Sequence, residues 1–342
     1  MPFKVLGKNP SGNRLDKILE SPNYKNNAFQ NLTNTPMQLE GASMAKLLKD
    51  FFFNKPKDAT PSQPLPFIKT DLNNISNEEP TIIWFGHSAY LIRINGKNIL
   101  VDPTFSGNAS PFSFMVKAFK GSNEYTVADM PNIDLLLLTH DHYDHLDYKT
   151  VKELLPKVKA IFCSMGVGSH LVYWGVPGNM ITEFDWWDTH SFEDLQFTAA
   201  PARHFSGRTT KRAQSLWSSF ILKTDKHNLY LGGDSGYETH FKMIGEKYGP
   251  FDIAILECGQ YNTMWPYIHM MPEETVQAAI DLKAKVLLPV HWAKFSLSLH
   301  SWDEPIIRVV KKATELGVSI TTPMIGEPVI LNRPYPSKHW WA

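Results

Sequence analysis

Residues 137–147 read Leu137-Leu138-Thr139-His140-Asp141-His142-Tyr143-Asp144-His145-Leu146-Asp147. Three imidazoles and several carboxylates fall within eight residues, immediately after an apolar run that predicts a buried strand. Such a cluster is costly to hold together unless a cation offsets the crowding of imidazole lone pairs and carboxylate charge. His140 and His142 alternate in an extended segment, so both side chains project to the same side. Asp144 and His145 lie on the following turn and reach a second point nearby, which suits two metal ions better than one.

Predicted strands and helices flank this cluster in both directions. Upstream, residues 90–94 and 97–101 surround Asn95-Gly96, a pair that suits a type I′ turn and therefore predicts a hairpin. Downstream, a helix is expected at about residues 148–155, where Pro156 stops it. Further strands are expected at residues 82–85, 196–199, 218–223, 228–231, 251–257 and 286–290, and further helices at residues 272–283 and 305–316. Sheets inside and helices outside predict a layered α/β fold.

Composition limits the classes of function. The chain has 342 residues, enough for one large domain or two ordinary ones. Its 34 Lys and Arg balance 34 Asp and Glu, so no overall charge attracts nucleic acid. Two cysteines form no disulfide framework, and we expect a reducing compartment. No apolar run reaches the ~18 residues of a spanning helix. We therefore expect a cytoplasmic protein with at most peripheral membrane contact.

The N-terminal part of the chain differs from the rest. Residues 1–78 have weak periodicity and several prolines, which predicts a partly irregular extension ahead of a domain at residues 79–342. One short helix is expected at about residues 42–53. It contains Phe51, Phe52 and Phe53, which either pack on the main domain or form a docking or membrane-facing element.

The string from His140 to His145 resembles the signature of the metallo-β-lactamase superfamily. The resemblance covers about residues 80–330 and implies a four-layer αβ/βα sandwich. It also implies further ligands, each directly after a predicted strand: His204, Asp234 and His291. By position, one metal would be held by His140, His142 and His204, and the other by Asp144, His145 and His291, with Asp234 as the bridge.

Within the superfamily, the chain is most similar to the N-acyl-phosphatidylethanolamine-hydrolysing phospholipase D branch. The matching strings include residues 84–87, 101–105, 185–187 and 233–237, and His269 ahead of Pro272-Glu273-Glu274. Bacterial relatives and ascorbate-phosphate lactonases share many of these strings, and a homodimer is common in the branch. The run Glu257-Cys258-Gly259-Gln260-Tyr261-Asn262 departs from the apolar run of the lipase members and leaves acyl-chain specificity open.

The ligand types indicate the metal and the chemistry. Histidine and carboxylate ligands without thiolate favour two zinc ions, with iron or manganese as alternatives. Two metals that share a water lower its pKa toward ~7, which supplies a bridging hydroxide, and they offset charge on phosphoryl oxygens. Asp144 is expected to orient this nucleophile, and His269 to contact the substrate phosphate. His87 is expected either to donate a hydrogen bond behind the ligands or to join them directly.

These observations predict a dinuclear zinc hydrolase, a phosphodiesterase that acts on phospholipid in the manner of the phospholipase D branch. The alternative is a soluble lactonase or small phosphoester hydrolase on the same metal centre. An apolar groove that opens to solvent would favour the first, and a small closed polar pocket the second. A nuclease is disfavoured by the zero net charge. A non-catalytic binding protein would need a missing metal ligand, and no ligand is missing.

Overall fold

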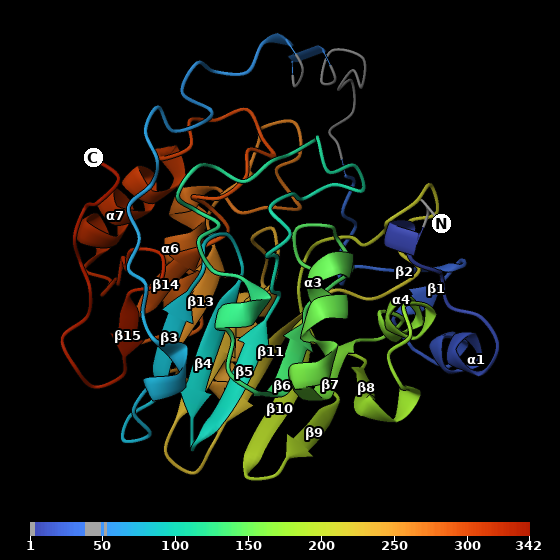
Figure 1. Cartoon of the computed structure of the whole chain (residues 1–342). Coiled ribbons are helices and arrows are strands. Elements are labelled where there is room, and N and C mark those ends of the chain that lie inside the picture. The colour runs from blue at the N-terminus through green and yellow to red at the C-terminus, as the bar shows by residue number, and fades with distance from the viewer. Residues whose placement is uncertain (1–3, 38–48, 51–52) are drawn as a thin grey trace.

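Two stacked β-sheets form the centre of the computed structural model, which describes residues 4–37, 49–50 and 53–342 (Figure 1). One sheet has seven strands: β3 (Thr81–Trp84), β4 (Tyr90–Ile94), β5 (Lys97–Val101), β6 (Ile133–Leu138), β7 (Val158–Ser164), β8 (Ile181–Phe184) and β15 (Pro328–Ile330). The other has six: β9 (Thr189–Phe192), β10 (Leu195–Pro201), β11 (Ser218–Lys223), β12 (Asn228–Leu231), β13 (Ile253–Glu257) and β14 (Leu287–Val290). Their orders are β15-β3-β4-β5-β6-β7-β8 and β14-β13-β12-β11-β10-β9.

Helices cover both outer faces of the sheets. The seven-stranded sheet carries α3 (Tyr148–Leu154) and α4 (Gly168–Tyr173), and the six-stranded sheet carries α5 (His240–Tyr248), α6 (Pro272–Asp281) and α7 (Glu304–Leu316). Strand β6 shows why its sequence suits this position. Leu135 and Leu137 point into the core between the sheets, whereas Leu136 and Leu138 pack toward α3 on the opposite face. The predicted α/β sandwich is confirmed.

Strand direction brings the ends of several strands to one edge. In the seven-stranded sheet β3, β5 and β6 run the same way, because β3 and β5 are both antiparallel to β4 and β5 is parallel to β6. In the other sheet, β10, β12, β13 and β14 share one direction by the same reasoning. The loops that follow these strands contain all the predicted metal ligands.

The predicted elements agree with these bounds to within two residues. Asn95 and Gly96 have φ values of 49° and 74°, as a type I′ turn between β4 and β5 requires. The helix expected at residues 42–53 falls largely outside the described residues, as do Phe51 and Phe52, whereas Phe53 is 82% exposed.

The N-terminal residues that the structure describes pack on the body of the molecule. They include α1 (Asn13–Leu19) and a hairpin of β1 (Tyr24–Lys25) and β2 (Ala28–Phe29). Ile18 and Phe29 are buried in a separate small cluster with Trp186 and Trp217. The division of the chain at residue 78 stays a prediction. Among the described residues, no helix is both long and apolar enough to cross a lipid bilayer.

Candidate metal centre

One group of potential ligands gathers His140, His142, His204 and Asp234, whose ligand atoms lie within 4.8 Å of one another. The Nδ1 atom of His142 is 2.9 Å from Nε2 of His140 and 3.2 Å from Nε2 of His204. His204 places its Nδ1 atom 2.7 Å from the carbonyl of Ile268, so Nδ1 donates there and Nε2 keeps a lone pair. Three imidazole nitrogens therefore lie close together without enough N–H groups to bridge them by hydrogen bonds. A cation bound between them would stabilise this arrangement.

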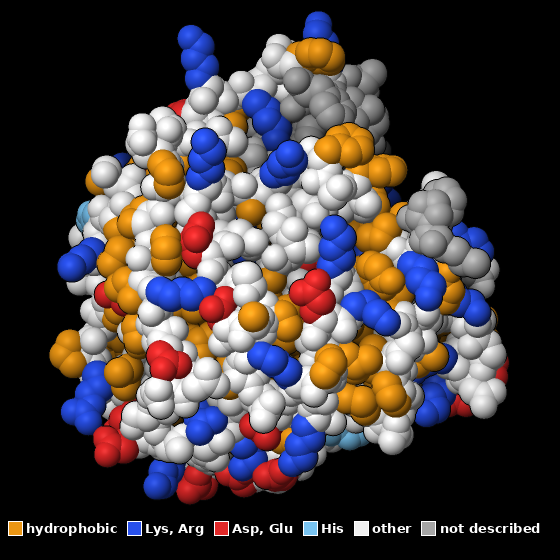
Figure 2. All heavy atoms as spheres, in the orientation of Figure 1, with side chains coloured by type: hydrophobic (Ala, Val, Ile, Leu, Met, Phe, Trp, Pro, Cys, Tyr) orange, Lys and Arg blue, Asp and Glu red, His pale blue; other side chains and the backbone are white. Residues whose placement is uncertain are grey.

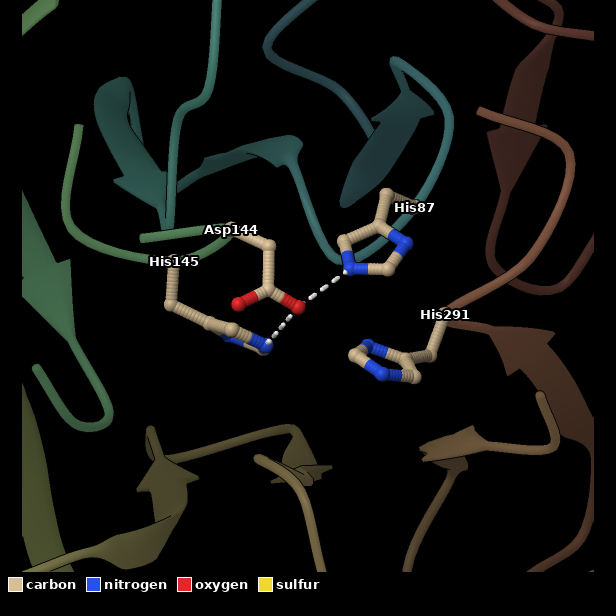
Figure 3. A group of neighbouring side chains, drawn as sticks. All are labelled: His87, Asp144, His145 and His291. Atoms are coloured by element: carbon tan, nitrogen blue, oxygen red, sulfur yellow. Dashed lines mark hydrogen bonds and ion pairs between the residues drawn. The ribbon is translucent and has the colours of Figure 1, made fainter. Parts of the chain in front are cut away.

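The second group gathers His87, Asp144, His145 and His291, again within 4.8 Å (Figure 3). Oδ2 of Asp144 is 2.9 Å from Nε2 of His87 and 3.6 Å from Nε2 of His145. Figure 3 shows these side chains directed toward a common centre, with His291 opposite Asp144. This set contains the three ligands expected for the second metal and adds His87.

Asp234 lies between the two groups. Its Oδ2 atom is 3.8 Å from Nε2 of His140 and 3.2 Å from Nε2 of His145, and its Oδ1 atom is 3.1 Å from Nδ1 of His291. Asp234 follows β12 in the six-stranded sheet, whereas His140 and His145 follow β6 in the other sheet. The carboxylate therefore occupies the position that a bridging ligand requires.

Hydrogen bonds behind the histidines fix their orientation. Asp102 accepts from Nδ1 of His145 at 2.8 Å and also from the backbone N–H and the hydroxyl of Thr139. The hydroxyl of Ser88 is 2.9 Å from Nδ1 of His291. Such partners select the tautomer that presents the other ring nitrogen to a metal.

Three residues at the same place have a strained backbone. His87, Asp102 and His291 have φ values of 52°, 40° and 68°, a left-handed conformation that residues with a Cβ rarely adopt. Non-glycine residues held in this way cluster at functional sites, where the surrounding structure over-determines them.

Burial favours the neutral, metal-binding form in three of the histidines, whereas in His145 the carboxylates of Asp234 and Asp144 outweigh burial and raise the pKa well above its ordinary value. Burial lowers the pKa of His140, His204 and His291 well below the ordinary value, so these imidazoles are neutral. Burial alone would raise the pKa of Asp234, but His145 and His291 outweigh it and lower that pKa well below its usual range.

Unpaired atoms inside the cluster fit divalent cations. His291 Nε2 is buried in the cluster without a hydrogen-bond partner, and His145 Nε2 and Asp234 Oδ1 have only ion-pair contacts, at 3.2 Å to Asp234 Oδ2 and 3.1 Å to His291 Nδ1. Buried polar groups without partners are rare, and each needs an explanation such as an ion. The donors are nitrogen and oxygen only, because Cys163 and Cys258 are buried away from both groups. This donor set suits zinc, iron or manganese.

His269 lies beside the centre, as expected for a residue that contacts substrate. It forms a third potential group with Asp234 and His291, and its Nδ1 atom is 3.1 Å from Oε2 of Glu257. Burial alone would lower the pKa of His269, but Glu257 outweighs it and raises that pKa to about 9. Burial also raises the pKa of Glu257 to about 7, so the pair holds at least one proton at neutral pH.

The structure thus brings together all seven predicted ligands and His269. Sequence reasoning left the role of His87 open and did not single out Glu257. His87 follows β3, far from the histidine-rich loop in sequence, and a histidine at the end of an apolar strand is the signal that points to it. Glu257 is an acidic residue in an otherwise apolar strand, which is a comparable signal.

A family model described as the β-lactamase superfamily domain matches residues 97–292. The chain belongs to the metallo-β-lactamase superfamily. A relative from Mycobacterium tuberculosis of uncharacterized function is 36% identical over 326 residues, which cover 94% of this chain and 88% of the relative.

Two further proteins are similar over a smaller share of this chain and at lower identity. N-acyl-phosphatidylethanolamine-hydrolyzing phospholipase D 1 of Caenorhabditis elegans is 29% identical over 228 residues, which cover 63% of this chain and 64% of that protein. The structure of Igni18, a metallo hydrolase from Ignicoccus hospitalis, matches with a TM-score of 0.58 and 20% identity, over 75% of this chain and 99% of that chain. This last similarity concerns the fold alone.

Proposed function

We propose that the protein is a dinuclear metal-dependent phosphodiesterase of the N-acyl-phosphatidylethanolamine phospholipase D type. The observation that carries this proposal is the pair of buried ligand groups, which lie on either side of one carboxylate, Asp234. The similarity to the nematode phospholipase supports the substrate class.

The residues divide into holders of metal and groups that act on substrate. His140, His142 and His204 would hold one ion, Asp144, His145 and His291 the other, and Asp234 would bridge them. When bound, two such metals supply a nucleophilic water of lowered pKa and neutralise phosphoryl oxygens. Nε2 of His87 donates a hydrogen bond to Oδ2 of Asp144, which leaves Oδ1 to orient the attacking water. We propose zinc as the native metal, with iron or manganese as the alternatives that elemental analysis would distinguish.

A cavity beside the centre supports an amphiphilic substrate. It has a volume of about 480 Å³ and lies between residues 28–37 and the loop that carries His204. Its lining is more polar than apolar. The polar side chains include Gln30, Asn31 and Thr33, the apolar ones include Leu32, Met37 and Phe205, and Arg212 contributes a positive charge. Leu32 and Met37 are exposed, so the cavity opens to the surface. The apolar side chains would contact an acyl chain, and the polar side chains and the guanidinium would contact a phosphate headgroup.

Surface charge is also consistent with an anionic substrate. On the face in Figure 2, Lys and Arg prevail toward the top and Asp and Glu gather toward the bottom, although the net charge of the chain is zero. The strands whose ends carry the ligands run toward the top of the same view (Figure 1). Basic side chains on that side would raise the local concentration of an anionic lipid.

A lipid hydrolysis assay tests the proposal. Zinc-loaded protein is incubated with N-acyl-phosphatidylethanolamine in mixed micelles, with the double variant His142→Ala, Asp144→Ala as control. We expect phosphatidic acid and N-acylethanolamine, detected by mass spectrometry, from the native protein only. If the protein carries two metals per chain and still forms no product, this substrate is excluded. The lactonase or small phosphoester hydrolase is then the function to test.

A further inference from the structure

A side chain of the N-terminal segment holds the backbone of a proposed metal ligand. Nδ2 of Asn31 donates to the carbonyl of His204 at 2.8 Å, and Oδ1 of Asn31 accepts from the N–H of His204 at 3.1 Å. Oδ1 also accepts from the indole N–H of Trp217 at 3.0 Å. One carbonyl and two N–H groups are compatible with this orientation of the amide only, so the position requires a donor and an acceptor on one short side chain.

The backbone of His204 depends on this contact. His204 follows β10 and lies outside every helix and strand. Within the part of the chain that the structure describes, Asn31 is the only hydrogen-bond partner of its N–H and its carbonyl. The histidine-rich loop differs, because there the N–H of His145 donates to the carbonyl of His142 within the same loop at 3.1 Å. One ligand of the first group is therefore placed by a residue 173 positions away in the sequence.

The segment around Asn31 is itself fixed to the loops that follow β10. Phe29 is 2% exposed, and its N–H donates to the carbonyl of Ala213 at 2.9 Å. On the other side of Asn31, Nε of Arg203 donates to the hydroxyl of Thr35 at 3.0 Å. Contacts on both sides therefore keep the amide of Asn31 opposite the ligand loop.

The same segment forms part of the proposed substrate site. Residues of the 28–37 segment and His204 together line the cavity of about 480 Å³ beside the centre. The β-lactamase superfamily domain is matched from residue 97 onward, so Asn31 lies outside it. The N-terminal segment therefore adds to the centre a part that the matched domain does not contain.

We propose that Asn31 is a positioning residue that holds His204 in the orientation required of a metal ligand. This inference rests on the proposed function, because it takes His204 to be a ligand of the first metal. Asn31 fixes the main chain of His204, and the carbonyl of Ile268 accepts from its Nδ1 at 2.7 Å, so Nε2 is directed toward His142. Without the amide of Asn31, the backbone N–H and carbonyl of this buried histidine lose their partners, and the ligand loop is free to move.

Separate affinities for the two metal ions distinguish this role from a general effect on stability. The native protein and Asn31→Ala are titrated with zinc against a chromogenic chelator. In Asn31→Ala we expect the affinity for one ion to fall about 10–100-fold, the usual effect of losing a partner behind a ligand, and the affinity for the other to change less than about threefold. Asn34→Ala is the matched control, because Asn34 is an exposed residue of the same segment and accepts from Arg203 through its backbone carbonyl, which alanine retains.

Cobalt(II) substitution identifies which of the two ions is affected. The visible absorption of bound cobalt depends on its ligands and their geometry, so each ion gives bands of its own. We expect Asn31→Ala to change the bands that His204→Ala also changes, and to leave the bands that His291→Ala changes as they are in the native protein.

Two results of these titrations would overturn the proposal. One is an unchanged affinity for both ions in Asn31→Ala, and the other is an equal loss for both ions, which indicates an effect on overall stability. A native protein that binds two zinc ions but does not hydrolyse N-acyl-phosphatidylethanolamine would reject the lipid substrate and leave this test intact. A native protein that binds no zinc would reject the metal centre and this inference with it.

Hydrogen exchange of the native protein covers the case in which Asn31→Ala does not fold. Because coupling between two sites is reciprocal, zinc should slow exchange in peptides that contain residues 28–37 as well as in peptides that contain His204, and by more than in peptides that contain α1. Mass spectrometry of the digested zinc-loaded and chelated protein measures these changes. Slower exchange around His204 with no change at residues 28–37 would contradict the proposal.

Discussion

Asp102 lies behind the proposed ligands and orients one of them. It accepts three hydrogen bonds, two from Thr139 and one from His145, so it fixes both the start of the histidine-rich loop and the ring of one ligand. In Asp102→Asn, the amide N–H₂ has to face a donor from Thr139 or His145. We expect zinc affinity to fall 10–100-fold, the usual effect of losing such a partner. Competition with a chromogenic chelator measures this, and Asp194→Asn, at an exposed site, is the control. If zinc affinity is unchanged in Asp102→Asn, the orientation of His145 does not depend on Asp102.

Lys294 is a charged residue in a place where charge is costly. It is 1% exposed, donates to the carbonyl of Phe85 at 3.2 Å, and lies near the rings of Phe105 and Phe295. Burial lowers its pKa to about 7, although Asp147 acts in the opposite direction. Because the unfolded chain holds this proton up to the ordinary lysine pKa, the native state is penalised at neutral pH and below. Stability therefore rises with pH from about 7 to about 10.

Replacing the amine of Lys294 should remove this penalty. We expect Lys294→Met to raise the free energy of unfolding at pH 7 by about 1–4 kcal/mol, as buried charges replaced by apolar groups often do. The gain should shrink toward pH 10, because the amine is neutral in the native state there and, so close to the ordinary lysine pKa, releasing its proton on folding costs little. Urea unfolding at the two pH values measures it, with Lys285→Met at an exposed site as control. A gain that is equal at both pH values would mean that packing, and not charge, is responsible.

At the scale of elements, a buried arginine links the N-terminal segment to the metal-binding loop. Arg208 is 4% exposed and donates to the carbonyls of Val5, Asp141 and Leu146, with its guanidinium 4.0 Å from the ring centroid of Tyr143. Lysine has no planar fork of donors and cannot reproduce these contacts.

Substituting this arginine should loosen the loop. In Arg208→Lys we expect the free energy of unfolding to fall by at least about 2 kcal/mol, because each buried carbonyl left unpaired costs about 1–3 kcal/mol. Zinc affinity should fall with it, since Asp141 lies between two ligands. Chemical denaturation and chelator competition measure the two effects. Arg93 donates to Asn77 and Asn98 near the end of β4. Arg93→Lys is therefore the control, and it should change both the free energy of unfolding and zinc affinity less than Arg208→Lys does.

The elements also show what the sequence could predict. Asn95-Gly96 predicted the hairpin, and several of the apolar runs ended shortly before a ligand, so these strands and the ligands of the centre could be predicted. Strand β9 and helix α4 were not, because Thr189–Phe192 is polar and exposed and α4 spans only six residues. His87 and Glu257 come from strands distant in sequence. Their places beside Asp144 and His269 follow from strand order, which local periodicity does not contain.

At the scale of the whole molecule, the metal centre lies across the junction of the two sheets. His87, His140 and His145 follow strands of the seven-stranded sheet, whereas His204, Asp234 and His291 follow strands of the other. Bound metals would therefore tie the sheets together at one edge and stabilise the fold as a unit. Without metal, the same edge holds buried carboxylates and crowded imidazoles, which weakens it.

Metal removal should accordingly destabilise the entire protein and not a single loop. A ligand present at a thousandfold excess over its Kd stabilises the native state by about 4 kcal/mol, so we expect zinc to raise Tm by several degrees over the chelated protein. The double variant His142→Ala, Asp144→Ala should show little of this gain, because it loses a ligand from each group. Thermal unfolding should be followed by far-ultraviolet circular dichroism and by tryptophan fluorescence. Trp84 of β3 stacks on Trp292 of the loop after β14, so among the ten tryptophans of the chain these two report on the junction of the sheets. If zinc raises the midpoint temperature of both signals equally, the metals stabilise both sheets cooperatively. If only the midpoint of the fluorescence rises, the metals stabilise the protein only around the centre, and the prediction is wrong.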